Sequence, residues 1–206
     1  NHEILPQKLQ NREIRFIDAI SEAIEISMKN HPNLVLMGQD IAEYGGAFKI
    51  TEGFVEKFGK KRVRNTPLCE AAIVGSGLGL SINGYKSMVE MQFADFVTEG
   101  FNQIINNLAK THYRWNQNAD VVVRMPTGAG TGAGPFHSQS NEAWFTKTPG
   151  LKIAYPAFPD DAKGLLIQSF EDPNPVLFFE HKKLYRSLKG NVPEGFYTTP
   201  FGKARK

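Results

Sequence analysis

Several features that would indicate particular classes of protein are missing from this sequence. There is one cysteine, Cys69, so no internal disulfide can form, which favours a reducing compartment. No apolar run approaches the roughly 20 residues that a membrane-spanning helix needs, and no signal peptide is visible. The net charge of +3 arises from 24 basic and 21 acidic residues without a dense basic block. The sequence therefore argues against both a membrane and a nucleic-acid partner.

Common phosphate and metal motifs are also missing. The sequence has no G-x-x-x-x-G-K-[ST] segment, and its five histidines are not spaced as zinc ligands. Gly128, Gly130 and Ala133 fit the dinucleotide pattern G-x-G-x-x-A after a predicted strand. However, Pro135 interrupts the helix that this motif must open, and no acidic residue follows at the required distance. We therefore assign neither a dinucleotide nor a zinc site.

Apolar segments with helical and strand periodicity alternate along the chain. Helices are predicted over 15–29, 51–58, 70–82, 96–116 and 160–170, and strands over 34–37, 87–91, 121–125, 151–155 and 176–180. This alternation predicts an α/β fold with three layers and a mostly parallel sheet. In such sheets, ligand sites form at the carboxyl ends of the strands.

The ends of the chain are more polar than its centre. We expect residues 1–14 to form an N-terminal arm, 15–190 a single domain, and 191–206 a linker towards a C-terminal domain that the sequence does not include. The final residues, KARK, are basic but short. The sequence thus reads as a fragment of a longer polypeptide.

Glu70 precedes an apolar segment, 71–82, that contains no charged residue. A poorly solvated carboxyl group has a raised pKa and can exchange a proton with a ring nitrogen near neutral pH. Alternatively, Glu70 only complements the dipole at the start of a helix. Gly75, Gly77 and Gly79 are expected to allow close packing of that helix, and Cys69 is expected to be an inert, small apolar side chain.

His137 lies near the end of a glycine-rich segment over 127–140, TGAGTGAGPFHSQS. Long loops of this kind in compact domains are usually functional or disordered. A histidine can exchange protons near pH 7, which makes His137 a candidate for acid–base chemistry. The alternative is a surface histidine hydrogen-bonded to the backbone.

Six sequence blocks occur in the order and at the spacing of one known family. They are TPLCEAAIVGSGLGLS, EMQFADF, PFHSQSNEAWF, PGLKI, EDPNPVLFFEHKKLYR and VPEGFY. Together they resemble the beta subunit of the thiamine-diphosphate-dependent 2-oxoacid dehydrogenases, and most of all the branched-chain (2-oxoisovalerate) members. The resemblance runs from about Arg15 to Tyr197. It implies a transketolase-like pyrimidine-binding domain that acts as half of a decarboxylating component.

The resemblance also implies roles for individual residues. Glu70 matches the glutamate that hydrogen-bonds the aminopyrimidine nitrogen of the cofactor, and Phe96 matches the aromatic residue that stacks on the same ring. Leu68 and Gln92 match positions that line this pocket. His137 matches the histidine that approaches the substrate and the acyl group. The implied reaction is oxidative decarboxylation of a branched-chain 2-oxoacid with acyl transfer to a lipoyl group.

A potassium site is implied by the same resemblance. It would involve Asp172, Asn174 and Ser169, with backbone carbonyls near Ala119, Val121 and Val122. Alternatively, the EDPNP segment is only the turn that ends a helix before a strand.

The family's diphosphate- and magnesium-binding motif, G-D-G followed by an asparagine pair, is missing from the sequence. In the family this motif lies on the alpha subunit or on the other half of a fused polypeptide. The expected partners are therefore that half, a lipoyl acyltransferase and a 2-oxoacid substrate, in a homo-oligomer located in the bacterial cytoplasm or the mitochondrial matrix. Two alternatives remain: a pyruvate or acetoin dehydrogenase beta region, and a non-catalytic assembly or binding module with the same fold.

Overall fold

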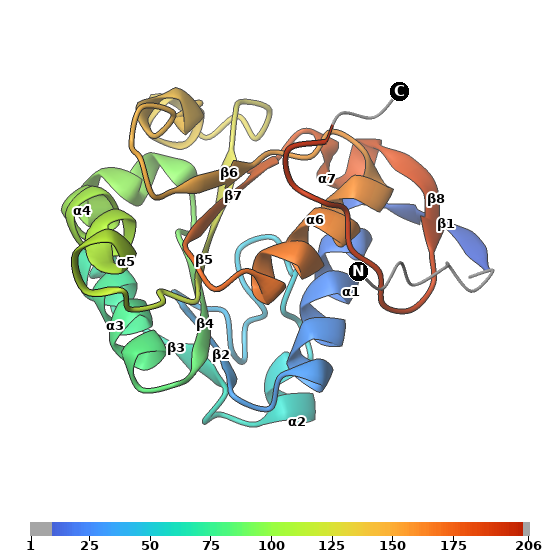
Figure 1. Cartoon of the computed structure of the whole chain (residues 1–206). Coiled ribbons are helices and arrows are strands. Elements are labelled where there is room, and N and C mark those ends of the chain that lie inside the picture. The colour runs from blue at the N-terminus through green and yellow to red at the C-terminus, as the bar shows by residue number, and fades with distance from the viewer. Residues whose placement is uncertain (1–9, 204–206) are drawn as a thin grey trace.

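A six-stranded parallel sheet forms the centre of the molecule, in the strand order β3-β2-β4-β5-β7-β6 (Figure 1). The computed structural model describes residues 10–203. The strands of this sheet are β2 (Leu34–Gly38), β3 (Val63–Asn65), β4 (Lys86–Glu90), β5 (Val121–Thr127), β6 (Lys152–Ala154) and β7 (Val176–His181). The predicted α/β class with a mostly parallel sheet is confirmed.

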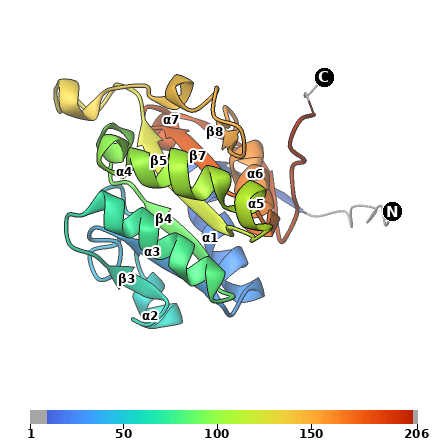
Figure 2. The ribbon, with the colours of Figure 1, turned by 60° about the vertical axis from the view of Figure 1, so that its left-hand side comes forward.

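Helices cover both faces of the sheet, as Figures 1 and 2 show from two sides. One face carries α1 (Phe16–Asn30), α6 (Pro159–Glu171) and α7 (Leu184–Ser187). The other carries α3 (Glu70–Ile82), α4 (Val97–Asn102), the π-helix η2 (Gln103–Leu108) and α5 (Ala109–Trp115). Four short elements complete the chain between these: α2 (Phe54–Phe58) and the 3₁₀ turns η1 (Ala94–Phe96), η3 (Pro135–His137) and η4 (Glu142–Trp144).

Two hydrophobic cores lie on opposite faces of the sheet. Along β2, Leu34 and Leu36 enter the core beneath α1 and α6, whereas Val35 and Met37 enter the core beneath α3. Successive side chains of a strand point to opposite faces, so a strand covered on both sides is apolar throughout. This arrangement is the three-layer architecture that the sequence predicts.

A second, two-stranded antiparallel sheet joins β1 (Asn11–Arg15) to β8 (Lys189–Pro193). Residues 11–14 of the predicted arm therefore lie in a strand, as do residues 191–193 of the predicted linker. The predicted arm over 1–9 lies outside the described residues. Sequence periodicity misses β1 because its side chains are largely exposed and polar, so no apolar alternation marks it. The remaining domain division stays a prediction.

The glycines of α3 differ in their surroundings. A Cβ on Gly77 would lie 3.0 Å from Val89 Cγ1, so this glycine lets α3 approach β4 closely. A Cβ on Gly79 would meet no atom within 4 Å. Within this chain, the prediction of close packing therefore holds for Gly77 and is wrong for Gly79. The sheet contacts only one side of α3, and Ala71 and Ala72 are exposed.

None of the helices within residues 10–203 combines the length and apolar character required to cross a membrane.

Candidate functional site

The predicted site residues follow the carboxyl ends of neighbouring parallel strands. Glu70 begins α3, a few residues after β3, and Gln92 and Phe96 follow β4. The glycine-rich loop with His137 follows β5. Because these strands are parallel, their carboxyl ends meet at one edge of the sheet, which we call the carboxyl edge.

The carboxylate of Glu70 is only 9% exposed and has one hydrogen-bond partner. Gln39, which follows β2, donates from Nε2 to Glu70 Oε1 at 3.0 Å. Among residues 10–203, nothing hydrogen-bonds Glu70 Oε2, and the side-chain oxygen of Gln39 is buried without a partner. The structure therefore orients one carboxylate oxygen with an amide and leaves the second able to bind a donor.

His137 packs edge-on against two phenylalanine rings. Its ring centroid lies 4.7 Å from that of Phe93 and 5.4 Å from that of Phe96, and the two phenylalanine rings are 5.7 Å apart. His137 Nδ1 is buried and has no hydrogen-bond partner within the described chain. The structure thus brings together two residues, Phe96 and His137, that are 41 positions apart. No contact of this kind joins Glu70 to the ring cluster within residues 10–203.

The loop that carries His137 is fixed at its base. Gln139 O accepts hydrogen bonds from Gly128 N at 2.9 Å and from Thr127 Oγ1 at 3.2 Å. Gly128 has a φ of +82°, and a Cβ at this position would lie 2.5 Å from His181 Nε2. Only glycine fits here without strain.

Asp95 connects this loop to the segment after β4. The carboxylate is 5% exposed, and its Oδ1 accepts the backbone N–H groups of Ser138 at 3.1 Å and Gln139 at 3.0 Å. Lys182, directly after β7, is also 5% exposed, and its Nζ lies 5.3 Å from the centroid of the Phe93 ring. Burial lowers the pKa of Lys182, while the charge of Asp95 raises it.

Leu68 and Gln92 also lie after carboxyl ends, of β3 and β4, but the structure gives them no defined partner. The Leu68 side chain is 80% exposed, and Gln92 is half-buried. Within the described part of the chain, no hydrogen bond fixes the side-chain amide of Gln92. Their predicted pocket-lining role stays a prediction.

Buried polar atoms without a hydrogen-bond partner are concentrated at the carboxyl edge. An unsatisfied buried polar group costs about 1–3 kcal/mol, so such groups require an explanation. In the described residues, every example except Ser27 follows the carboxyl end of a strand. The side chains concerned are Gln39, Thr66, Asp95, His137, Asn141, Glu142 and Lys182.

A fully buried ion cluster lies at the carboxyl ends of the central strands. Arg124 donates to Glu180 from Nε at 2.5 Å and from Nη2 at 2.9 Å, and it also pairs with Glu90. Tyr185 donates its hydroxyl to Glu180 Oε2 at 2.6 Å. Burial raises the pKa of Glu90, and the charge of Arg124 opposes that rise. Arg124 thus joins Glu90 to Glu180, and Tyr185 bonds Glu180, so this cluster ties three neighbouring strands together at the carboxyl edge.

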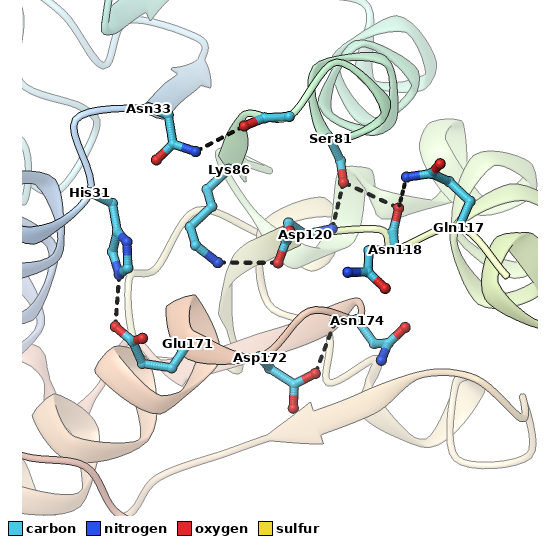
Figure 3. A network of polar contacts seen from close by, with 11 residues as sticks. His31, Asn33, Ser81, Lys86, Gln117, Asn118, Asp120, Glu171, Asp172 and Asn174 are labelled. Atoms are coloured by element: carbon cyan, nitrogen blue, oxygen red, sulfur yellow. Dashed lines mark hydrogen bonds and ion pairs between the residues drawn. The ribbon is translucent and has the colours of Figure 1, made fainter.

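The predicted potassium residues lie at the opposite, amino edge of the sheet, which Figure 3 shows. Asp172 Oδ1 accepts the backbone N–H of Asn174 at 2.9 Å, and Asp172 Oδ2 accepts from Lys152 Nζ at 2.6 Å. The Ser169 hydroxyl donates to Leu165 O at 2.7 Å, so it is not directed at Asp172. No group of three or more acidic, histidine or cysteine side chains suited to a metal occurs in residues 10–203.

The fold and the carboxyl edge define a class of protein: a three-layer α/β domain with a buried carboxylate, an aromatic cluster and a histidine on a glycine-rich loop at the carboxyl ends of its parallel strands. The sequence profile of the transketolase pyrimidine-binding domain matches residues 12–187. The chain belongs to this family.

Several 2-oxoacid dehydrogenase beta subunits align with nearly the whole chain. It is 48% identical to the 2-oxoisovalerate dehydrogenase subunit beta of Bacillus subtilis (strain 168) over 92% of its length. It is 43% identical over 94% to the mitochondrial 2-oxoisovalerate dehydrogenase subunit beta 2 of Arabidopsis thaliana, and 39% identical over 93% to the pyruvate dehydrogenase E1 component subunit beta of Staphylococcus aureus (strain Mu50 / ATCC 700699). The chain spans only 58%, 54% and 60% of the length of these three relatives, respectively.

A solved structure supports the fold. The inactive beta4 tetramer of a split gene transketolase aligns with a TM-score of 0.62, over 81% of this chain and 50% of the other, at 22% sequence identity.

Three residues of this edge escape prediction from sequence: Gln39, Asp95 and Lys182. Gln39 directly follows the buried strand LVLMG, so its place at a carboxyl end is a signal that could have marked it. Asp95 lies inside the block EMQFADF beside Phe96, where the aromatic residue draws attention first. Lys182 is one of two adjacent lysines, and nothing in the sequence distinguishes the buried one from an exposed neighbour.

Proposed function

We propose that this chain is the pyrimidine-binding half of the decarboxylating component of a branched-chain 2-oxoacid dehydrogenase. The reaction would be oxidative decarboxylation of the 2-oxoacid with acyl transfer to a lipoyl group. Membership of the family and the identities to 2-oxoisovalerate dehydrogenase beta subunits support this proposal. The observation that carries it is the concentration of unpartnered buried polar atoms at the carboxyl edge, beside Glu70 and His137.

The residues present at this edge suit a thiamine diphosphate pyrimidine ring. Glu70 is only 9% exposed and has one carboxylate oxygen without a hydrogen-bond partner in the described chain, and this oxygen can hydrogen-bond a ring nitrogen. Phe96, at the same carboxyl edge, would stack on the ring, and Leu68 and Gln92 would complete the walls. When bound, thiamine diphosphate supplies the carbanion chemistry of decarboxylation. The protein contributes the orientation and the proton.

His137 would act on the substrate rather than on the cofactor. Its ring is packed against Phe93 and Phe96, and its buried Nδ1 is without a partner in the described chain. An imidazole nitrogen that has no partner within the protein can hydrogen-bond the carboxylate or carbonyl group of a 2-oxoacid, and later the acyl group. Replacing His137 by alanine should reduce turnover or acyl transfer, with cofactor affinity close to normal.

The site would be completed by a second polypeptide segment. Magnesium prefers carboxylate, water and phosphate oxygens, and residues 10–203 offer no cluster of this kind. We therefore assign the diphosphate and its magnesium ion to an alpha subunit or a fused half. A lipoyl acyltransferase would receive the acyl group, within an oligomer located in the bacterial cytoplasm or the mitochondrial matrix.

Potassium is the expected ion at the amino edge. Asp172 and Asn174 provide oxygen atoms, and the carbonyl groups near Ala119, Val121 and Val122 would add others. Ser169 would contribute its carbonyl, since its hydroxyl bonds Leu165 O. The ammonium group of Lys152 holds Asp172 Oδ2, so potassium would have to compete with it or bind Oδ1. Measuring the melting temperature in potassium and in choline chloride at equal ionic strength tests this: stabilisation by potassium supports the site.

A titration with and without the diphosphate-binding half tests the function. We expect the isolated chain to bind thiamine diphosphate and magnesium weakly in calorimetry and to catalyse nothing. Decarboxylation of 3-methyl-2-oxobutanoate should appear when the partner half is added. A higher kcat/KM for pyruvate would instead support the pyruvate dehydrogenase alternative, which the Staphylococcus aureus relative keeps open. Cofactor binding without turnover in the assembled protein would indicate a binding module.

A further inference from the structure

The loop that carries His137 is held by few contacts of its own. Residues 129–136 are exposed, and Gly128, Gly130, Gly132 and Gly134 all have positive φ angles. Glycine loses more conformational freedom on folding than any other residue, so a segment with four of them is costly to order. Hydrogen bonds within the loop join Gly128 to Gln139 and Gly134 to His137 and Ser138, and groups outside the loop contribute the remaining constraints.

Asp95 is the outside group that bonds the loop next to His137. Its Oδ1 accepts the N–H groups of Ser138 and Gln139, the two residues that directly follow the histidine. Hydrogen bonds to an ionised acceptor are roughly twice as strong as neutral ones. Asp95 itself lies in η1, between Phe93 and Phe96, the two residues whose rings contact the His137 ring. One short segment thus fixes both the backbone and the ring of the histidine.

Lys182 supplies the charge that suits a buried carboxylate. Its ammonium group is buried, and no hydrogen bond joins it to another group within residues 10–203. Within the described chain, Lys182 and Asp95 form no direct ion pair; the charge of Asp95 raises the pKa of Lys182, and the centroid of the Phe93 ring lies 5.3 Å from Nζ. The backbone N–H of Lys182 also donates to Thr127 O, at the base of the His137 loop. Lys182 is therefore linked to the His137 loop by a backbone hydrogen bond and to Asp95 by electrostatic attraction.

We propose that Asp95 is a positioning residue that fixes the His137 loop, with Lys182 as its buried counter-charge. This inference rests on the proposed role of His137. The carboxylate holds the loop backbone, the rings of Phe93 and Phe96 hold the imidazole, and the ammonium group offsets the cost of burying the carboxylate. Asp95 and Lys182 thereby determine the position of the His137 side chain relative to the substrate.

Hydrogen exchange of the loop amides tests the positioning directly, without any activity assay. In the full-length protein assembled with its partner half, Asp95→Ala should raise exchange of the amides of Ser138 and Gln139 by at least about tenfold, because two charge-assisted hydrogen bonds are lost. Asp95→Asn should give a smaller rise, since its amide oxygen still accepts, and it keeps the test valid if the alanine variant does not fold. Asp120→Ala, which removes a carboxylate from the amino edge, is the matched control. Unchanged loop exchange in both Asp95 variants would overturn the proposal.

Kinetics separate this inference from the proposed function. Asp95→Asn should lower kcat while KM and cofactor affinity stay close to normal, and combining it with His137→Ala should add little further loss. If the loop loosens but kcat falls only in His137→Ala, the positioning role is wrong. If His137→Ala itself turns over normally, the proposed function of the histidine fails, whereas the exchange data still decide whether Asp95 holds the loop.

The counter-charge has its own pair of variants. Lys182→Met keeps most of the side-chain volume and removes the charge, so loop exchange should rise, though less than in Asp95→Ala. Lys163→Met is the matched control, because Lys163 is also buried, burial also lowers its pKa, and it bonds Glu22 and Pro193 O away from the loop. Equal effects of the two lysine variants on the loop, or none from Lys182→Met, would overturn the role of Lys182.

Discussion

The amino and carboxyl edges of the central sheet differ in how completely their polar side chains are hydrogen-bonded. At the amino edge, polar side chains are paired: Lys86 bonds Asp120 at 3.2 Å, His31 bonds Glu171 at 2.7 Å, and Ser81 Oγ accepts the backbone N–H of Asp120 at 2.7 Å (Figure 3). At the carboxyl edge, seven residues keep buried polar atoms without a partner in the described chain. The amino edge is thus built from paired polar groups, whereas the carboxyl edge combines paired groups, such as Arg124 with Glu180, with buried polar atoms that have no partner in the described chain.

This difference separates stability from function. A paired polar group contributes modestly to the stability of the fold, whereas a buried polar group without a partner lowers the free energy of unfolding. Such a cost persists in a native protein when the group serves something other than the fold, for example a ligand or a partner. Substitutions at the amino edge should therefore lower stability, and substitutions at the carboxyl edge should lower activity.

Replacing Glu70 by alanine gives the largest expected effect. General acid–base groups contribute typically about 10²–10⁴-fold, so hydrogen exchange at the thiazolium carbon of bound cofactor should slow by that factor in the assembled enzyme. The free energy of unfolding should fall by no more than about 1–3 kcal/mol, because the buried Gln39 amide loses its acceptor. The amino-edge variant Glu171→Ala should exchange normally. Normal exchange in Glu70→Ala would remove the reason to place function at the carboxyl edge.

Gly128→Ala tests the rigid base of the His137 loop. The new Cβ would need a positive φ and would collide with His181, so we expect a loss of about 1–3 kcal/mol in the free energy of unfolding, with reduced turnover. Gly132→Ala is the matched control, since its φ is +71° but a Cβ there meets nothing within 4 Å. Urea denaturation measures both. Similar losses in the two variants would show that the collision with His181 has no effect.

Asp120→Ala tests whether a substitution at the amino edge lowers stability without lowering activity. It removes a partly exposed ion pair with Lys86, so we expect a loss of about 1 kcal/mol or less in the free energy of unfolding. Turnover and cofactor affinity should not change. A large loss of activity at normal stability would contradict the division between the two edges.

The pH dependence of Lys182 gives the smallest effect. Burial lowers its pKa below the ordinary value of 10.5, so the unfolded chain binds more protons between these two pKa values. Stability should therefore rise with pH across that window in the parent protein relative to Lys182→Met. Urea denaturation of both proteins in steps from pH 8 upward measures the difference. A difference that stays constant with pH, or that favours Lys182→Met as pH rises, would contradict the buried position of the ammonium group.

Sequence reasoning recovers the parts of this molecule that repeat a strong pattern. The helix over 70–82 is confirmed with the same bounds, because an apolar, uncharged run of that length follows Glu70. The predicted helix over 96–116 is confirmed as a helical segment, although it includes a π-helix at Gln103–Leu108. The strand β3 is missed because only Val63 of its three residues is buried. The roles of Glu70 and His137 stay predictions.

The partners of the candidate residues could not be predicted. A hydrogen bond such as that from Gln39 to Glu70 joins residues 31 positions apart, and it depends on how two strands align in the sheet. The same holds for Asp95 and the loop amides, 43 and 44 positions away. Periodicity reports which face of an element is buried, but not which side chains meet at its end. Those contacts follow from strand order, which a single sequence does not encode locally.

The pairing of β1 with β8 has a consequence for how the protein is made. Asn11 pairs with Pro193, so the two strands of this small sheet come from opposite ends of the domain. During synthesis, the first strand must wait until almost the whole domain has left the ribosome. Chains emerge at about 5–20 residues per second, so this delay is on the order of ten seconds or more. Until β8 has been synthesised, the backbone groups of β1 can pair with strands of other chains. A chaperone that binds nascent chains would therefore have its greatest effect during this interval.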